Sequence, residues 1–570
     1  MRVPAARRAY AYPPELFERH DTFEMFLLDG GAFFFTKEHV DSTSSGAWLA
    51  KLADGSLLAP WMVKGKLQWD KAFDDTYGSP CWAALEKHVW LNRLYFLLPM
   101  AHRFLLTRDE RWAELWLRYL RSWSAAHPYA RDERYPATKR NWRDMQVTWR
   151  LLVLTHSTFL LGGSKYLDKP KWAFVYRMIR QHAEHVHWEA AKSLAEGTGK
   201  GNHFLQKGLA LLYAGILLPE LGHACEYIKT GRGVVKQQLN TEIDPDGGSI
   251  EASPSYSHFI ARMYLEAHLL LKQNKLPPIP GLESKLRKQY AFLELTAAPD
   301  GTTLQLSDSY AMDADADIAL VREVYPLPKK SRNASVAFPR SGFAVLRSRR
   351  FAAYIDAMLG AGHVHPGKPN VLIYVDGKPL TIDSGSANYD THWQAYWYRL
   401  PEAHNILLIR PTKDEGRPAF AKATAGKQTK DGTAIVPTYR LKRFDKRSAV
   451  FEHVFKEKGF RFVWTRALRI DGESLTIDDR VKASRRGEAR QLWHIAPWNL
   501  KMRYKDDPRR VVVRVDKTHV LVRQMGAKAP PFAFEYRPAI GPDNRVCNSA
   551  QISSCAVGRE FALRTRLTIL

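Results

Sequence analysis

The stretch GKGNHFLQKGLALLYAG, residues 199–215, decides how the first half of the chain is predicted to fold. Its side chains Leu205, Leu209 and Leu212, with Ile216 just beyond, follow the i, i+4, i+7 and i+11 spacing of one buried helix face. The same helical spacing recurs from about residue 82 to residue 298. Helices that follow one another through short connections, without strand patterns between them, predict a bundle, solenoid or toroid of paired antiparallel helices.

After residue 326 the pattern changes to an alternation of polar and apolar residues. The segments NVLIYVDGKPLTIDSG and RALRIDGESLTIDDRVKA alternate in this way and contain Asp-Gly pairs, which are typical of hairpin turns. The second half is therefore predicted to be antiparallel β-structure, with the Pro-, Lys- and Ser-rich residues 325–342 as the linker. The expected domains are a segment at 1–80 that packs on the helices, a helical domain at 81–325 and a β-domain at 335–570.

The chain of 570 residues is strongly basic, with 85 Lys and Arg against 59 Asp and Glu and a formal net charge of +26. A field of that sign attracts nucleic acid, anionic lipid and acidic polysaccharide alike, so charge does not choose among them. The four cysteines have no metal-ligand or redox spacing, and we expect free thiols. The basic N-terminus is not followed by the apolar run of a signal peptide, and we expect a soluble protein.

Two polar residues, Asn202 and His203, stand at the start of the helix in the opening stretch. Asn is among the best helix N-caps, so Asn202 has a purely structural explanation. The N-terminus of a helix also attracts anions, and an amide beside an imidazole suits a ligand with negative charge. The two explanations stay open at this point.

Two further segments hold polar residues that folding alone does not require. The segment DPDGGSIEASPSYSHF places Glu251, Tyr256 and His258 at a junction between a loop and a helix. The segments GHVHPGKPNVLIYVDGKPLTIDSG and AHN contribute residues of the β-region: His363, His365, Asp383, His404 and Asn405. Each residue has a structural alternative: a packed ring for Tyr256, a pairing with Arg or Lys for Glu251, and a solvent-facing His-x-His pair on a strand.

Together these segments resemble the heparinase II/III-like polysaccharide lyases. The matching pieces, in the family's order, are GNHFLQKGLALLYAG, DGGSIEASPSYSHF, GHVHPGKPNVLIYVDGKPLTIDSG and AHN, and with weaker helical matches they cover most of residues 85–410. The resemblance implies an incomplete N-terminal (α/α) toroid followed by a sandwich-like antiparallel β-sheet domain that contributes histidines to the cleft.

The chemistry implied by the resemblance is β-elimination beside a uronic acid. Removal of the C5 proton would create a dianion, so an enzyme must first neutralise the neighbouring carboxylate. The resemblance assigns that task to Asn202 and His203. It assigns the transfer of protons to Tyr256, with His363 as a second base.

The resemblance also implies a metal site made of His365, Asp383 and His404. Two imidazoles and a carboxylate suit a divalent ion, zinc first and manganese or calcium as alternatives, and we expect a structural role for it. The family often reads Gly-His-Gly-His-x-Asp, whereas this chain has Val364 and Pro366 in GHVHPG. Pro366 stiffens the loop after the second histidine, which leaves the ligand geometry open.

Three arginines, Arg93, Arg150 and Arg399, are expected to bind substrate, because a guanidinium can pair with carboxylate or sulfate through two hydrogen bonds. Trp142 is a candidate platform for a sugar ring. The expected partner is an anionic polysaccharide and neither nucleic acid nor a membrane, with the protein a monomer or homodimer. The resemblance implies a periplasmic or secreted protein, with the cytoplasm as the alternative.

The favoured substrate is a glycosaminoglycan (hyaluronan, chondroitin sulfate or heparan sulfate), and alginate or another polyuronate is the alternative. A protein of a different class, which binds polyanions without cleaving them, would share the basic charge. A glycoside hydrolase would need two carboxylates across the scissile bond, and Asp244, Asp246 and Glu251 could supply them. That last hypothesis leaves Asn202 and Tyr256 without a role.

Overall fold

The computed structural model of the chain describes residues 58, 62–64, 66–70, 89, 91–129, 140–360, 363–386, 394–412, 438–457, 460–497, 503–504, 507–526, 528–542 and 544–570. Most of the segment predicted at 1–80 lies outside these residues. The described residues form two compact units. The helical unit holds the described residues up to Glu242 together with Phe259–Leu286, and the β unit holds Ile243–His258 and the described residues from Arg287 onward.

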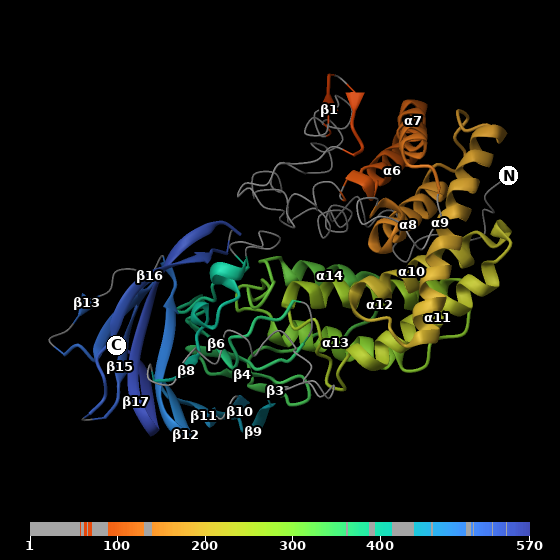
Figure 1. Cartoon of the computed structure of the whole chain (residues 1–570). Helices are drawn as coiled ribbons and strands as arrows, with labels where there is room; N and C mark the ends of the chain where they lie inside the picture. The colour runs from red at the N-terminus through yellow and green to blue at the C-terminus, as the bar shows by residue number, and fades with distance from the viewer. Residues whose placement is uncertain are drawn as a thin grey trace. The chain divides into compact units, whose positions relative to one another are not determined.

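Helices make up most of the helical unit, which is coloured from red to yellow-green in Figure 1. The α-helices among the described residues are α6 (Leu97–Thr107), α7 (Glu110–Ala126), α8 (Asp144–Leu160), α9 (Lys169–Glu196), α10 (Gly201–Leu217), α11 (Ala224–Glu242), α12 (Pro254–Gln273), α13 (Leu282–Thr296) and α14 (Ala314–Val324). Shorter helical turns are η2 (Arg140–Trp142), η3 (Pro219–Leu221), η4 (Gln394–Tyr398) and η5 (Pro401–Ala403). A two-stranded hairpin precedes them, β1 (Met62–Val63) and β2 (Lys66–Leu67).

Helix α10 lies at the centre of the helical unit and packs against α8, α9 and α11. The predicted apolar face is confirmed, because Leu205, Leu209 and Leu212 are all buried. Glycines let α10 approach α11 closely. A Cβ atom at Gly208 would lie 2.8 Å from Val234, and one at Gly231 would lie 2.7 Å from the carbonyl oxygen of Gly208. Larger side chains at these positions would push the two helices apart.

The β unit contains two antiparallel sheets. The five-stranded sheet has the order β3-β4-β5-β6-β7, and its strands are β3 (Val336–Phe338), β4 (Phe343–Arg347), β5 (Phe351–Asp356), β6 (Asn370–Val375) and β7 (Lys378–Pro379). The ten-stranded sheet has the order β13-β14-β15-β17-β12-β11-β10-β9, with β16 paired to β17 and β8 paired to β12.

The ten-stranded sheet supplies the longest strands, which Figure 1 draws in blue shades. They are β8 (Leu407–Pro411), β9 (Thr438–Phe444), β10 (Ser448–Glu457), β11 (Phe460–Asp471), β12 (Ser474–Ile495), β13 (Arg503–Tyr504), β14 (Arg510–Val515), β15 (Thr518–Gln524), β16 (Ala533–Ile540) and β17 (Val546–Ile569). Ile355 and Ile373 of the smaller sheet share one buried core with Leu468 and Ile477 of the larger one. The two sheets therefore pack face to face as a sandwich.

The Asp-Gly pairs lie at turns, as the sequence predicts. Asp376 and Gly377 connect β6 to β7 with φ angles of 50° and 77°. Positive φ at both central residues is the geometry of a type I′ hairpin turn, which Asp and Gly tolerate better than other residues. Gly472, between β11 and β12, also has a positive φ of 57°.

The division into units differs from the single boundary predicted between residues 325 and 335. Helix α14 and the second part of α13 belong to the β unit, as does the segment Ile243–His258. Side chains join these pieces to the rest of the unit; Tyr354 of β5, for example, donates a hydrogen bond to the carbonyl oxygen of Ala297 (2.9 Å). Helical periodicity identifies a helix and not the core on which it packs, so the compact units do not follow the change from helical to strand patterns along the chain.

Three cysteines within the described residues, Cys225, Cys547 and Cys555, are free thiols as expected, and Cys81 lies outside them. Among the described residues no helix is both long and apolar enough to cross a membrane.

Candidate active site

Two of the predicted catalytic residues meet in the β unit. Tyr256 stands in the first turn of α12, and His363 lies in the segment between β5 and β6. Their rings are stacked, with centroids 3.6 Å apart and an interplanar angle of 21°. The His363 side chain keeps 22% of its surface exposed, and Tyr256 is half-buried. The structure thus places a phenol and an imidazole side by side within reach of solvent.

Asp308 organises this site, and sequence reasoning missed it. Its Oδ2 atom accepts hydrogen bonds from His363 Nδ1 (3.1 Å) and from Arg399 (2.9 Å). Its Oδ1 atom accepts from His365 Nε2 (2.8 Å) and from the Ser386 hydroxyl (2.9 Å). Asp308 follows α13 in a short polar run, SDSY, that carries no recognisable motif.

The charge of Asp308 follows from these contacts. Burial raises the pKa of its carboxyl, but the hydrogen bonds from His363 and His365 and the positive charge of Arg399 outweigh burial and hold that pKa below its usual range. Asp308 is therefore an anion at neutral pH. Since a carboxylate can only accept, His363 donates through Nδ1, and the lone pair of the neutral ring lies on Nε2.

Arg399 is the predicted substrate-binding residue that the structure places at this cluster. It lies between η4 and η5, its side chain is 39% exposed, and it donates to the same oxygen of Asp308 as His363 does. Glu251 lies on the other side of His363, with its Oε2 atom 3.8 Å from Nε2. A carboxylate at this distance would stabilise the imidazole once Nε2 also carries a proton.

The predicted metal ligands also converge in the β unit. His365, Asp383 and His404 are buried, and one potential ligand atom from each lies within 4.8 Å of those of the other two. The nitrogens His365 Nδ1 and His404 Nε2 are buried without a hydrogen-bond partner among the described residues. Pro366 does not keep the histidine next to it from approaching the other two residues. Two unpaired imidazole nitrogens beside a carboxylate fit a divalent ion such as zinc.

Neighbouring groups orient these three side chains. His404 Nδ1 donates to Asp383 (2.8 Å), and Asn370 also donates to this carboxylate. Burial raises the pKa of Asp383, but the charge and hydrogen bond of His404 outweigh burial and lower that pKa, which keeps the carboxyl ionised. Gly367 packs directly against the His404 ring, where a Cβ atom would collide with it. Asp308, through His365, connects this trio to His363.

The polar pair of the opening stretch lies in the helical unit, in the first turn of α10. The N-cap of α10 is Lys200, and Asn202 accepts a hydrogen bond from Gln206 (3.2 Å), so the N-cap interpretation of Asn202 is wrong. His203 is half-exposed and donates through Nδ1 to Asp144 (2.7 Å). This bond leaves Nε2 of the neutral His203 ring as the available nitrogen.

A charge network surrounds His203. Lys207 forms ion pairs with Asp144 (3.1 Å) and with Glu189 (3.0 Å). Burial raises the pKa of Asp144, but His203 and Lys207 outweigh that effect and lower it. The first N–H group of α10, that of Gly201, donates to Glu242 (2.6 Å), so a carboxylate of the protein already occupies part of the helix N-terminus.

The structure corrects the substrate-binding prediction for Arg150. Its side chain is fully buried, donates to His182 Nε2 (3.0 Å) and to the carbonyl oxygen of Asn92 (2.7 Å), and lies over the Trp123 ring. Arg93 is 4% exposed and donates to Gln146 (3.4 Å).

Trp142, expected as a platform for a sugar, is buried against Trp123 and His182. Helical periodicity placed Trp142 and Arg150 on helices but did not show which face was internal.

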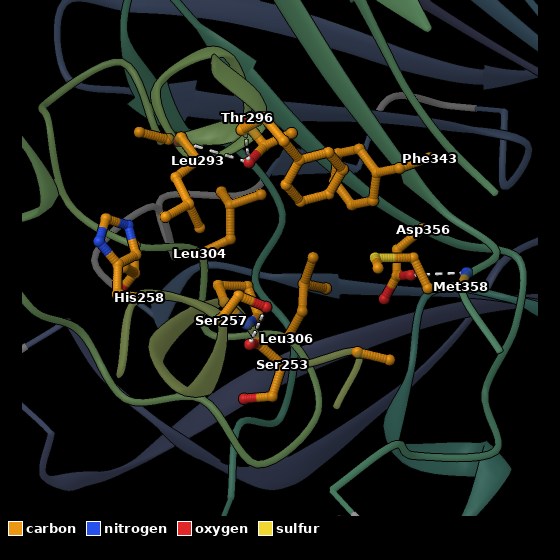
Figure 2. A pocket seen from close by; sticks show the side chains of 15 residues that line it. Ser253, Ser257, His258, Leu293, Thr296, Leu304, Leu306, Phe343, Asp356 and Met358 are labelled. Atoms are coloured by element: carbon orange, nitrogen blue, oxygen red, sulfur yellow. Dashed lines mark hydrogen bonds between the residues drawn. The ribbon is translucent and has the colours of Figure 1, made fainter. Parts of the chain in front are cut away.

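A small pocket beside the second polar segment is not a site for an anionic sugar (Figure 2). Apolar side chains dominate its lining, among them Leu293, Leu304, Leu306, Phe343 and Met358. His258, which also lines it, pairs with buried Asp317 (2.7 Å) and has a structural role. An apolar lining would remove water from a carboxylate or sulfate without replacing it, which is unfavourable.

The fold assigns the protein to a structural class, a helical toroid followed by an antiparallel β-sheet domain. It shares its fold with the crystal structure of heparinase III, with a TM-score of 0.71, 17% identity and coverage of 90% of this chain and 80% of that one. It is also similar to the chondroitin AC lyase of Streptomyces coelicolor A3 solved with chondroitin sulphate (TM-score 0.58, 11% identity, 97% of this chain and 83% of that one). The predicted fold, a helical toroid followed by an antiparallel β-sheet domain, is confirmed.

Two family models then identify the particular family. Heparinase II/III N-terminus matches residues 58–331, and Heparinase II/III-like, C-terminal matches residues 330–547. The chain belongs to the heparinase II/III-like lyase superfamily. A heparin-sulfate lyase of Bacteroides stercoris is 23% identical over 372 residues, which are 57% of this chain and 53% of the relative. The chain spans 53–61% of the length of the curated relatives it matches.

Proposed function

We propose that this protein is a polysaccharide lyase that cleaves a uronate-containing glycosaminoglycan by β-elimination. The observation that carries the proposal is the stacked pair of Tyr256 and His363, with the imidazole held through Nδ1 by Asp308. Heparan sulfate is the first substrate to test, because the curated relatives are named heparin-sulfate lyases. Hyaluronan, chondroitin sulfate and alginate are the alternatives.

In the proposed reaction His363 Nε2 takes the C5 proton of the uronate. The electron pair of the C5–H bond forms the C4–C5 double bond, the C4–O4 bond breaks, and Tyr256 donates its phenolic proton to O4. Because the two rings are stacked, both can face the same side of one sugar ring. The carboxylate of Asp308 stabilises His363 while the imidazole carries the added proton.

Arg399 gives the site a positive charge beside the reacting groups. Its guanidinium shares the Asp308 oxygen with His363 and remains 39% exposed, so part of it is available to an anionic group of the substrate. The predicted role of Asn202 and His203, neutralisation of the uronate carboxylate, remains a prediction. The half-exposed His203 ring, oriented by Asp144, has the character that the role requires.

We also propose that His365, Asp383 and His404 hold a divalent ion, with zinc as the first candidate. When bound, such an ion would cross-link the loop that carries His363 to the segments that carry Asp383 and His404, which is a structural role. The two unpaired imidazole nitrogens support this proposal. The elimination steps themselves use only side chains of the protein.

The experiment that tests the function is an absorbance assay with a panel of acidic polysaccharides. A lyase creates an unsaturated uronate, which absorbs in the near ultraviolet, at every cleavage. Binding without absorbance would identify a polyanion-binding protein, and new reducing ends without absorbance would identify a hydrolase. The hydrolase is disfavoured because Asp246, one of its candidate carboxylates, accepts hydrogen bonds from the backbone of Arg340 (2.7 Å) and from Ser341.

A further inference from the structure

A basic groove crosses one face of the ten-stranded sheet in the β unit. The basic side chains that define it include Arg443, Arg447, Arg469, Arg480, Arg564 and Arg566. They come from β9, β11, β12, β17 and the turn before β10. None of the lining residues belongs to the cluster formed by Tyr256, His363 and Asp308.

The strand register explains why the arginines gather on one face. Arg469 pairs with Thr476, Thr476 with Arg566, Arg566 with Arg523, and Arg523 with Arg510. Paired residues of antiparallel strands point to the same face, and neighbouring strands lie about 4.8 Å apart. A row of guanidinium groups therefore runs across the sheet from β11 to β14.

This face is the outer face of the sandwich. Leu468 and Ile477, which alternate along β11 and β12 with the groove residues, lie in the core shared by the two sheets. Since successive side chains of a strand point to opposite faces, Arg469 and Thr476 point away from that core. Arg469, Arg480, Arg564 and Arg566 are indeed exposed.

The acidic side chains of the groove leave part of its positive charge uncompensated. Asp478 accepts hydrogen bonds from Arg480 (3.0 Å) and Arg564 (2.6 Å). Asp445 is engaged by the turn before β10, where it accepts from the Ser448 N–H group and hydroxyl. The positive charge of Arg443 also acts on Asp445. Within the part of the chain that the structure describes, however, the guanidinium groups of Arg443, Arg447 and Arg469 form no hydrogen bond and no close ion pair. Like charges gathered on a sheet face repel one another, and an anionic ligand would relieve that repulsion.

We propose that this groove is a second binding site for the anionic polysaccharide, separate from the residues that carry out the elimination. The choice of ligand rests on the proposed function. Guanidinium groups suit carboxylate and sulfate, which they can contact through two parallel hydrogen bonds. No aromatic side chain is found among the groove residues described, so the groove lacks the stacking platforms on which nucleic-acid bases bind. A long chain held at two sites remains near the enzyme after each cleavage, whereas a short oligosaccharide gains nothing from the groove.

The test compares two variants with the same change in net charge. The groove variant replaces Arg443, Arg447 and Arg469 by Gln. The control variant makes the same replacement at exposed arginines of the β unit outside the groove lining: Arg461, Arg514 and Arg559. Both are built on Tyr256→Phe, so that long heparan sulfate is not cleaved while its affinity is measured. We expect the groove variant to bind it about tenfold more weakly, as three partly exposed charge contacts would give, and the control to bind nearly as tightly as the parent.

The same two triple variants with Tyr256 intact are then assayed by absorbance. The groove variant should have a raised KM for the long chain and an unchanged kcat/KM for a tetrasaccharide. Equal loss of affinity in the groove and control variants, or no loss in either, would overturn the proposal. A loss confined to binding of single-stranded DNA would identify a nucleic-acid site and also overturn it. Absence of absorbance with every substrate would refute the lyase and leave the binding comparison intact.

Discussion

Asp308→Asn is the substitution that most directly tests the proposed site. Asn has nearly the same shape as Asp and keeps one acceptor oxygen, but it lacks the negative charge and replaces the other oxygen with a donor. His363, His365, Arg399 and Ser386 all donate to Asp308. The variant therefore cannot satisfy all four donors, and His363 loses its fixed orientation.

The size of the effect follows from the His363–Asp308 bond. A hydrogen bond to a charged group contributes about 1.5–3 kcal/mol, and Asp308 would contribute most when His363 carries the proton taken from the sugar. Losing that contribution lowers kcat by roughly 10- to 150-fold, since each 1.36 kcal/mol is a factor of about ten in rate. The assay is the initial rate of absorbance increase at saturating polysaccharide, with thermal unfolding to show that the variant is folded.

Ser386→Ala is the matched control for this substitution. The Ser386 hydroxyl donates to the same carboxylate, but it does not touch His363 and takes no part in the proposed proton transfer. Its loss should therefore lower the free energy of unfolding by about 1.5–3 kcal/mol and change kcat much less than Asp308→Asn does. A folded Asp308→Asn protein with kcat close to that of the wild type would refute the assignment of Asp308 as the residue that positions His363.

Asp308 also gives the stability of the protein a defined pH dependence. Its pKa in the folded protein lies below the ordinary value of 3.8, so the carboxylate stabilises the fold at pH values above 3.8. That contribution is lost as the pH falls below 3.8 towards the lowered pKa that Asp308 has in the folded protein. The difference in the free energy of unfolding between wild type and Asp308→Asn should therefore be constant near neutral pH and shrink on acidification, and a constant difference down to pH 2 would contradict the ionised state of Asp308.

The remaining predictions concern the phenol, the amide and the metal ligands. Tyr256→Phe should abolish turnover and leave the Kd for heparan sulfate within a few-fold of the wild type, because only the hydroxyl is removed; retained turnover would place the proton donor elsewhere. Asn202→Ala should lower kcat by at least about tenfold while the protein stays folded. Because Asn202 is buried and accepts a hydrogen bond from Gln206, the free energy of unfolding should fall by about 1–3 kcal/mol. An unchanged kcat would remove Asn202 from the reaction. Elemental analysis of the purified protein should find one divalent ion per chain. The His404→Ala variant should lose this ion and have a lower Tm. A metal-free wild-type protein with the same Tm before and after chelation would rule out the site at His365, Asp383 and His404.

Short-range patterns in the sequence were sufficient for much of the fold and for part of the site. The buried face of α10, the alternation along β11 and β12, and the turn at Asp376 and Gly377 all follow from the spacing and type of residues close in sequence. The resemblance of ordered motifs supplied Tyr256, His363 and the metal trio, which the structure does bring into two adjoining clusters within the β unit.

Only the tertiary structure revealed Asp308 and corrected Arg150. Asp308 is joined to His363, His365, Ser386 and Arg399 across separations of 55, 57, 78 and 91 residues, which no local pattern records. Arg150 has the sequence signature of a surface arginine on a helix, and it is buried because of the carbonyl oxygens and aromatic rings that other helices place around it. Periodicity reports the conformation of a segment, whereas burial and pairing depend on which distant segments pack against it, and that is settled only when the whole chain folds.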